Sequence, residues 1–293
     1  MPTRLPSWQL FAVAVLIWGT TWHAILYQLA VWPPEYGVAL RFGLAALTVF
    51  GVALWRGDRL RLPAGQQRRV AVQGIFMYGL AYLCVYHGER HVPSGLVAVG
   101  YATSPLLAGL GAWALWRSPL TLRFGAGGLL GVLGVALIFA PELATVDRSP
   151  TAGTGLAYTV GAVLLSAVGA LSASRNAHHG LPFWPTVAWG LAWGAGTAGA
   201  AALLTVPLPQ AWPTAASWWL SLAYLAVAGT VVAFGAFLTL QHRLGPAKAS
   251  TIGVMTPVVA LVVSAVFEGF RPGPMTLASA GLTVLGNVLM LRR

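Results

Sequence analysis

Charged residues are scarce in this sequence. Only 8% of its 293 residues are Asp, Glu, Lys or Arg, and 57% are hydrophobic, whereas a soluble domain carries about 25% charged residues. With 17 basic and six acidic side chains, a water-soluble protein of this length would expose a surface that is almost entirely apolar. The composition therefore excludes a soluble globular domain and indicates an integral membrane protein.

Cysteine and catalytic motifs are equally scarce. Cys84 is the only cysteine, which excludes an internal disulfide and a multi-cysteine metal site. The sequence contains no His-Glu-x-x-His zinc motif, no Gly-x-Ser-x-Gly nucleophile motif and no paired intramembrane aspartates. We therefore predict a protein that is not an enzyme, with no catalytic residue, metal or cofactor. A membrane-embedded enzyme and a metabolite channel are the alternatives.

The positive net charge of the chain does not indicate nucleic-acid binding. The formal charge is +11, yet the basic residues lie in short clusters between apolar runs and form no continuous stripe. Clusters of this kind are typical of cytoplasmic loops. If the amino terminus is cytoplasmic, 13 basic residues lie inside and only Arg90, Arg148 and Arg271 lie outside, together with five of the six acidic residues. We predict that both termini are cytoplasmic.

Long charge-free segments predict ten membrane-spanning helices. A helix needs about 20 apolar residues to cross about 30 Å of hydrocarbon. Charged residues delimit most of the segments, and the turn signals Pro207-Leu208-Pro209-Gln210 and Trp212-Pro213 divide the longest one. The predicted fold is an all-α integral membrane protein with spans at 8–28, 35–55, 70–88, 93–116, 122–141, 153–175, 183–205, 217–241, 246–268 and 274–291.

The two halves of the chain resemble each other. Shifting the sequence by 152 positions superposes Thr103-Ser104-Pro105 on Met255-Thr256-Pro257. Because each half carries five spans, an odd number, the second half must cross the membrane in the opposite sense to the first. We therefore predict two inverted five-helix repeats, residues 1–146 and 147–293, and alternating access around a site at their interface. Chance similarity between apolar helices is the alternative.

A set of short motifs extends over nearly the whole chain. They are Trp18-Gly19-Thr20-Thr21-Trp22, Pro34-Glu35, Leu40-Arg41-Phe42, Leu96 through Ser104-Pro105, Thr256-Pro257, Glu268 and Gly286. Together they resemble the drug/metabolite transporter superfamily, in particular its ten-helix EamA-type members. One motif departs from the family pattern, because Trp116-Arg117 stands where the family often has Gly-Glu. The glutamate of this repeated motif is therefore present only in the second half, as Glu268.

The resemblance implies a multi-pass transporter of a bacterial inner membrane. It implies export of amino acids or related metabolites, and the YddG-type aromatic amino acid exporters are the group that it suggests. The partners expected from it are a small-molecule substrate and the lipid bilayer.

Two prolines lie within predicted spans at equivalent positions of the two halves. Pro105 falls in the span 93–116 and Pro257 in the span 246–268. Each removes a backbone hydrogen bond and clashes with the preceding turn, and the freed carbonyls must face protein or water. We predict a pair of hinges that flank the substrate site, with static packing kinks as the alternative.

Aromatic residues recur at helical spacing and predict a cavity wall. Trp18 and Trp22 are four residues apart in the first span, and Tyr78, Tyr82 and Tyr86 follow one another at the same interval in the third. Tyrosine hydroxyls in mid-membrane need polar partners, so this face should line a cavity or a helix contact. The other predicted cavity residues are Tyr101, Ser104, Phe234, Phe237 and Thr256. Such a cavity suits a neutral or zwitterionic solute with an apolar side chain.

Three basic or titratable residues are further candidates for the site. Arg41 lies about six residues into the second span, where a cation is a functional candidate by default, and the alternative is a structural partner of Glu35 or of backbone carbonyls. Lys248 follows Gly245-Pro246, where its side chain could also extend to the cytoplasm. His23 lies deep in the first span and is a candidate to change charge near neutral pH, and the alternative is a neutral imidazole held by a hydrogen bond. Proton antiport, exchange and facilitated diffusion all remain open.

Small residues at four-residue spacing mark two helix faces. Gly127 and Gly131 lie in the fifth predicted span, and Gly190 and Gly194 lie in the seventh. Such spacing favours close helix packing, and it also allows a homodimer face.

Overall fold

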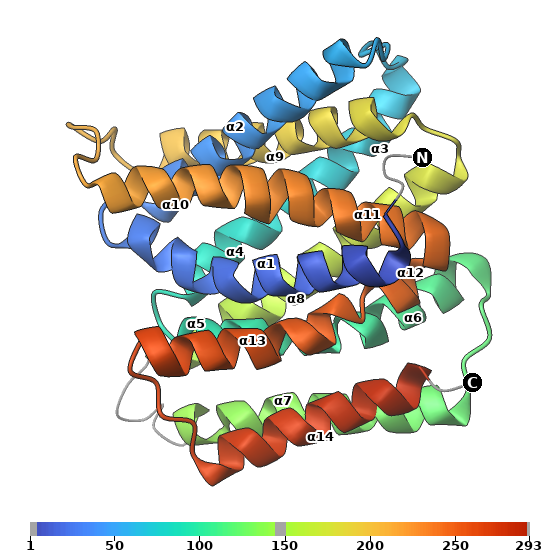
Figure 1. Cartoon of the computed structure of the whole chain (residues 1–293), viewed down its shortest axis with the longest axis vertical. Helices are drawn as coiled ribbons and strands as arrows, with labels where there is room; N and C mark the ends of the chain where they lie inside the picture. Colours follow the sequence, from blue (N-terminus) through green and yellow to red (C-terminus); the bar gives the residue numbers. More distant parts are fainter. Residues whose placement is uncertain (1–4, 144–150, 292–293) are drawn as a thin grey trace.

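The computed structural model describes residues 5–143 and 151–291, and these residues form helices and no strand (Figure 1). Seven helical segments are long and apolar enough to cross a membrane. They are α1 (Ser7–Leu29), α2 (Pro34–Trp55), Ala64–Gly88, Ser94–Trp116, α8 (Thr151–His178), α9 (Phe183–Thr205) and Ala216–Leu244. Three shorter apolar segments accompany them, namely Leu122–Leu137 within α7 (Leu122–Leu143), α13 (Ile252–Phe267) and Pro274–Met290 within α14 (Pro274–Leu291).

The predicted spans agree with these helices to within a few residues at most ends. The third span differs most, since it is predicted to begin at residue 70 and its helix begins at Ala64. The predicted boundary between residues 146 and 147 lies outside the described residues, as do Arg4, Arg148, Arg292 and Arg293, which entered the orientation argument. The helix positions follow from charge spacing because a charged side chain is costly in hydrocarbon.

The helices lie side by side in one bundle (Figure 1). α2 packs on α9 at one edge, α7 packs on α14 at the opposite edge, and α1 packs on α13 between them. α1 begins and α14 ends at the same end of the bundle (Figure 1). The interior of the bundle therefore lies between the two outer pairs of helices.

Both glycine faces are covered by neighbouring helices of the same chain. A Cβ on Gly127 would overlap the carbonyl oxygen of Gly286 in α14, and a Cβ on Gly194 would overlap Tyr78. These contacts place helix backbones close together, as small residues in membrane helices permit. The faces therefore serve packing within the chain.

Two of the long helices contain a π-helical turn that the sequence does not predict. Between Ala64 and Gly88, α3 (Ala64–Gly74) is followed by the π-helix η1 (Ile75–Leu80) and by α4 (Ala81–Gly88). Between Ala216 and Leu244, α10 (Ala216–Ala226) is followed by the π-helix η3 (Val227–Val232) and by α11 (Ala233–Leu244). A shift of 152 positions carries α3 onto α10 and η1 onto η3, residue for residue.

The helices around the two predicted hinge prolines are both interrupted. In the first, α5 (Ser94–Gly100) passes through a 3₁₀ turn, η2 (Tyr101–Thr103), into α6 (Ser104–Trp116), so that Pro105 lies in the first turn of α6. In the second, α12 (Pro246–Ala249) is separated from α13 by a turn, and Pro257 lies inside α13. Proline is well tolerated in a first helical turn because its missing N–H has no partner there.

Candidate functional site

A cavity of about 100 Å³ lies in the interior of the bundle. Eight of the nine predicted cavity residues line it, and they are Trp18, Trp22, Tyr82, Tyr101, Ser104, Phe234, Phe237 and Thr256. The additional lining residues are Thr21, Ile25, Met77, Ala108, Ser166, Ala167, Ala170, Ser250, Ile252 and Gly253. The structure thus brings residues from six helices of the bundle around one central space, which we call the central cavity.

Aromatic rings in mutual contact form one wall of the central cavity. The ring centroids of Trp18 and Phe234 are 4.9 Å apart and those of Trp18 and Phe237 are 5.5 Å apart. Trp22 and Tyr101 are separated by 5.3 Å in the same way. Edge and tilted contacts of this kind add about 0.5–1.5 kcal/mol per pair beyond simple burial, so the wall is held in a defined shape.

Hydroxyl groups supply most of the polar atoms around the cavity. The hydroxyls of Tyr101 and Ser166 lie 2.9 Å apart, and Thr256 Oγ1 donates to the carbonyl of Ile252 at 2.8 Å. Thr21, Tyr82, Ser104 and Ser250 also contribute hydroxyls to the lining. An apolar space with a few placed hydroxyls fits a solute that is mainly apolar and carries few polar groups.

The π-helical turn η3 holds Trp18 in position. Trp18 Nε1 donates to the carbonyl of Gly229 at 3.0 Å. A π-helical turn changes the backbone pairing and makes carbonyls available to side chains, and such turns are frequent at functional sites. The side chain of Thr230 in the same turn donates to the carbonyl of Leu225, five residues earlier. η3 therefore holds the Trp18 side chain of the cavity wall in position through this hydrogen bond.

Arg41 lies behind the wall, fully buried. Its Nε donates to Thr230 Oγ1 at 3.2 Å, and its guanidinium carbon lies 4.6 Å from the ring centroid of Tyr82. Nη1 and Nη2 have no hydrogen-bond partner among the described residues. The alternative in which Arg41 pairs with Glu35 is not what the structure shows, because Glu35 Oε1 lies 2.9 Å from Nε2 of His87. Glu35 at the start of α2 faces α4, whereas Arg41 faces η3.

Tyr78 is the one predicted cavity residue that does not line the cavity. Its ring packs against Phe42 at 5.5 Å and against Phe234 at 4.9 Å, so Phe234 separates it from the space. The reason is η1, because a π-helical turn breaks the four-residue interval that places Tyr78, Tyr82 and Tyr86 on one face. Tyr86 also points elsewhere and donates to Oε1 of Gln28 at 2.8 Å.

The two interrupted helices touch each other at the cavity. A Cβ on Gly253 would lie 2.7 Å from the carbonyl oxygen of Tyr101. Tyr101 stands four residues before Pro105 and Gly253 stands four residues before Pro257, so each belongs to the turn that a proline disturbs. The neighbouring carbonyl of Ala102 accepts a hydrogen bond from Nδ2 of Asn287 at 3.0 Å. The prolines therefore lie beside the site, and their role as hinges remains a prediction.

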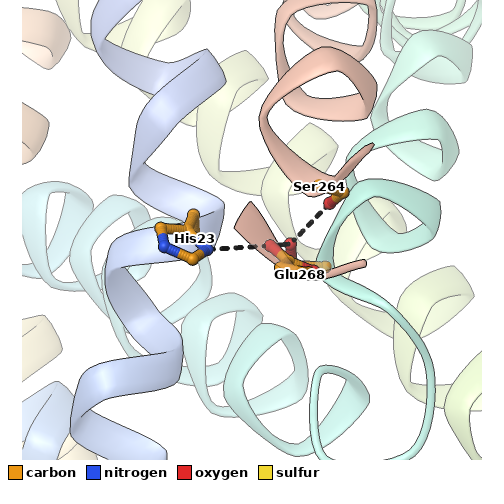
Figure 2. A network of polar contacts seen from close by, with 4 residues as sticks. His23, Ser264 and Glu268 are labelled. Carbon is orange, nitrogen blue, oxygen red and sulfur yellow. Dashed lines mark hydrogen bonds and ion pairs between the residues drawn. The ribbon is translucent and has the colours of Figure 1, made fainter. Parts of the chain in front are cut away.

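The end of the bundle that carries Glu35, Glu89 and Glu268, which we call the acidic end, is closed by polar contacts. Nδ1 of His23 lies 3.1 Å from Oε1 of Glu268, as Figure 2 shows. Oε1 of Glu268 also accepts a hydrogen bond from Ser94 at 2.6 Å. The predicted site residue His23 thus contacts a glutamate 245 residues away and does not line the cavity.

The opposite end of the bundle contains a larger hollow of about 590 Å³. Exposed His178 and His242 line it together with Gln241. Nε2 of Gln241 donates to the carbonyl of Ala170 at 3.0 Å, and Ala170 lines the central cavity. The hollow therefore approaches the central cavity along α8 and α11, with Gln241 between them. Lys248 is exposed and lines neither space.

Sequence reasoning missed several lining residues that the repeat shift would have found. Adding 152 positions to Trp18 and Tyr101 gives Ala170 and Gly253, and both line the central cavity. Small residues carry no aromatic or hydroxyl signal of their own. No such shift finds His23 and Glu268, whose contact joins α1 to the end of α13.

An apolar bundle of this kind, with an aromatic cavity at its centre and a hollow at one end, defines a membrane transport protein. A family model described as the EamA-like transporter family matches residues 7–140 and 153–292. The chain belongs to the EamA-like transporter family, within the drug/metabolite transporter superfamily. It is a transporter and not an enzyme.

Several relatives extend this likeness over the whole chain. An uncharacterized transporter of Archaeoglobus fulgidus is 24% identical over 302 residues, which cover 99% of this chain and all 100% of the relative. The uncharacterized inner membrane transporter YedA of Escherichia coli is 24% identical over 293 residues, 98% of this chain and 90% of YedA. Protein PagO of Salmonella typhimurium is 28% identical over 159 residues, which span 54% of this chain and about half, 52%, of PagO.

A solved crystal structure has the same overall fold. It matches with a TM-score of 0.72 at 19% sequence identity, over 97% of this chain and 96% of that chain. At this identity the likeness concerns the fold alone, and the residues of the site are argued from this chain.

Proposed function

We propose that the protein is an inner-membrane secondary transporter that exports small organic metabolites by alternating access, in particular amino acids with apolar or aromatic side chains. The observation that carries this proposal is the aromatic central cavity at the contact of two interrupted helices. Transporter sites are commonly built from discontinuous helices near the bilayer midplane. The family and its relatives support transport in general, and the solute class rests on the cavity.

Two inverted halves, residues 1–146 and 147–293, form the proposed scaffold. The shift of 152 positions relates the two π-helical turns. It also relates four pairs of residues that line the same cavity. These pairs are Trp18 and Ala170, Tyr82 and Phe234, Tyr101 and Gly253, and Ser104 and Thr256. Two separate matches of the family model, to 7–140 and 153–292, further support a duplicated unit.

The proposed orientation places the acidic end outside and both termini in the cytoplasm. It is supported by the excess of basic residues at the opposite end, and by α1 beginning and α14 ending at one end of the bundle (Figure 1). In this orientation the hollow at His178 and His242 faces the cytoplasm, and the contacts of His23, Glu268 and Ser94 close the outer side. The structure then corresponds to a conformation closed to the outside.

The size and lining of the central cavity restrict which solutes can bind there. A volume of about 100 Å³ is below the ~300–1,000 Å³ typical of sites for drug-sized ligands. The aromatic wall and the hydroxyls of Tyr101 and Ser166 fit an apolar side chain and a few polar groups. Phosphorylated solutes are disfavoured because no basic side chain among residues 5–143 and 151–291 lines this cavity.

Counterflow in proteoliposomes is the experiment that tests the proposal. Vesicles loaded with one unlabelled amino acid are given the same labelled amino acid outside, and phenylalanine, leucine and glutamate form the first series. Saturable uptake that is stimulated by internal solute, and that prefers phenylalanine or leucine, is expected of this carrier. Unsaturable flux without stimulation would instead indicate a channel.

Tyr82→Ala is expected to reduce the ratio of maximal rate to half-saturating concentration about tenfold. The substitution removes the ring that borders the cavity and that stacks on Arg41, and one such contact contributes about 0.5–1.5 kcal/mol. Trp8→Ala is the matched control, because Trp8 is also aromatic and is exposed near the start of α1. Both variants should insert and elute as the wild type does. Equal counterflow in Tyr82→Ala and wild type would show that the ring of Tyr82 has no role in transport.

A further inference from the structure

A buried carboxylate at the acidic end has no part in the cavity or in the closing contacts described above. Glu89 directly follows the spanning segment Ala64–Gly88 and is only 6% exposed. Neither of its carboxylate oxygens has a hydrogen-bond partner within the described part of the chain. An ionised carboxylate without partners is costly to bury, and such a group tends to bind a proton.

The charged and polar groups that face Glu89 come from several helices. Glu268, at the end of α13, and Arg41, on α2, both interact with it electrostatically. Tyr82 and Tyr101, which line the central cavity, also interact with it. Glu89 therefore lies at the acidic end of the bundle and interacts electrostatically with two residues of the cavity wall.

The remaining titratable groups near Glu89 are already engaged. His87, on its own helix, lies 2.9 Å from Glu35, which leaves neither of these two groups as a partner for it. His91 stacks on the ring of Tyr158, and Arg90 is exposed. Of the carboxylates and imidazoles, Glu268 and His23 remain, and they form the pair seen in Figure 2.

The electrostatic balance at Glu89 favours its neutral form. Burial raises the pKa of Glu89 well above its usual range, the Glu268 carboxylate raises it further, and the Arg41 guanidinium opposes the two. The balance therefore leaves the carboxyl protonated at pH values where an exposed glutamate is ionised, since the ordinary pKa is about 4.3.

A proton fits this position better than a metal cation. Within residues 5–143 and 151–291, no three His, Cys, Asp or Glu side chains are placed to hold a metal ion. Glu89 lines neither the central cavity nor the hollow at the other end, so neither of these two spaces brings a hydrated ion or an organic group against it. A proton needs no such space.

We propose that Glu89 is a proton-binding residue that exchanges its proton through the pair of Glu268 and His23, and that this exchange drives solute export. In the inward step, a proton from outside water passes through the pair and converts the Glu89 carboxylate to the neutral acid. In the release step, the neutral acid gives its proton to water on the cytoplasmic side, and the carboxylate returns. Its negative charge then attracts the unpaired Nη1 and Nη2 of Arg41, which stacks on Tyr82 in the cavity wall.

Infrared spectroscopy of the purified full-length protein tests the protonation directly. The carbonyl stretching band of a protonated carboxyl is recorded between about pH 5 and about pH 8, above the ordinary glutamate range. The wild type is expected to show this band at pH values where an exposed glutamate is ionised, ¹³C-glutamate labelling is expected to shift it, and Glu89→Gln is expected to lose it. Asp58→Asn is the control, because Asp58 lies beside Arg56 at the opposite end of α2 and should leave the band intact.

Thermal stability supplies a second readout with a defined sign. A carboxyl whose pKa is raised on folding stabilises the protein fully at pH below the unfolded value, and this contribution is lost as pH rises through the folded value. Glutamine is neutral throughout, so the fall of Tm with rising pH should be smaller in Glu89→Gln than in the wild type. A wild type without the band, or a variant with the band unchanged, contradicts protonation of Glu89.

The coupling half of the proposal rests on the proposed function and needs a separate measurement. In proteoliposomes, an inward proton gradient should raise export several-fold in the wild type, while Glu89→Gln should keep counterflow and lose the response to the gradient. An unchanged response in Glu89→Gln, or a response to sodium in place of protons, would contradict the coupling. If no solute moves in the wild type either, the transport proposal fails while the infrared result still decides the protonation.

Discussion

Replacing Arg41 with methionine is expected to lower transport at least 30-fold while leaving the protein as stable as the wild type or more stable. Arg41 is fully buried, and two of its three guanidinium nitrogens lack partners among the described residues. Exchanging a buried charge for an apolar side chain of similar length is often neutral or stabilising, by up to about 4 kcal/mol. The transport rate should fall because Arg41 stacks on Tyr82 and interacts with Glu89. Loss of a buried charge that acts in a site costs at least about 2 kcal/mol, which corresponds to a change of about 30-fold in rate.

The Arg41→Met experiment separates function from folding because it measures both. Counterflow and Tm are recorded for Arg41→Met and for Arg56→Met, whose arginine is exposed and lies 3.6 Å from Asp58. The free energy of unfolding of the Arg56→Met control should match that of the wild type within about 0.5 kcal/mol. Wild-type transport in Arg41→Met would show that the buried cation is only structural. A large loss of Tm would show that its contacts outweigh the cost of burying its charge.

Gly253→Val is expected to lower transport at least tenfold by forcing the two interrupted helices apart. A Cβ at this position would lie 2.7 Å from the carbonyl oxygen of Tyr101, and a backbone atom cannot turn away as a side chain can. Overpacking of this kind typically costs about 1–3 kcal/mol. The displaced residues include Gly253 and Tyr101 themselves, which both line the central cavity.

Gly281→Val is the matched control for this substitution. Gly281 is also helical, in α14, and no atom lies within 4 Å of a Cβ built there. The control should transport as the wild type does, so that the general effect of a β-branched residue in a helix is subtracted. Equal counterflow in Gly253→Val and wild type would mean that the contact between the interrupted helices has no role in transport.

The sequence predicts the helices well because charge placement in a bilayer is a strong constraint. A run without Asp, Glu, Lys or Arg identifies a span almost by itself. The aromatic residues of the cavity are also predictable, since Trp18 and Trp22 recur at the helical interval and need a common face. The same reasoning fails at Tyr78, because the π-helical turn η1 alters the four-residue interval between residues on one helix face. No sequence signal in Ile75–Leu80 predicts this turn.

Contacts between distant segments are the part that the sequence does not reveal. Glu35 stands six residues before Arg41 and is the acidic residue nearest to it in the sequence. In the structure, however, Glu35 contacts His87 on another helix. His23 looks isolated in α1 and lies beside Glu268. Only the packing of the helices decides such pairs, because the partners lie on different helices, 52 and 245 residues apart in the chain. The buried Glu89 gives no signal in sequence, where it is one more acid at the end of a span.

Closing the acidic end with a reversible covalent bond tests alternating access most directly. The hydroxyl oxygens of Ser94 and Ser264 lie 3.2 Å apart across α5 and α13, so Ser94→Cys and Ser264→Cys are combined in a Cys84→Ser background. Counterflow of the preferred amino acid is measured before oxidation, after oxidation and after reduction, with the disulfide verified by mass spectrometry. The account predicts that oxidation abolishes counterflow and that reduction restores it. Transport at the full rate by the disulfide-linked protein would contradict it.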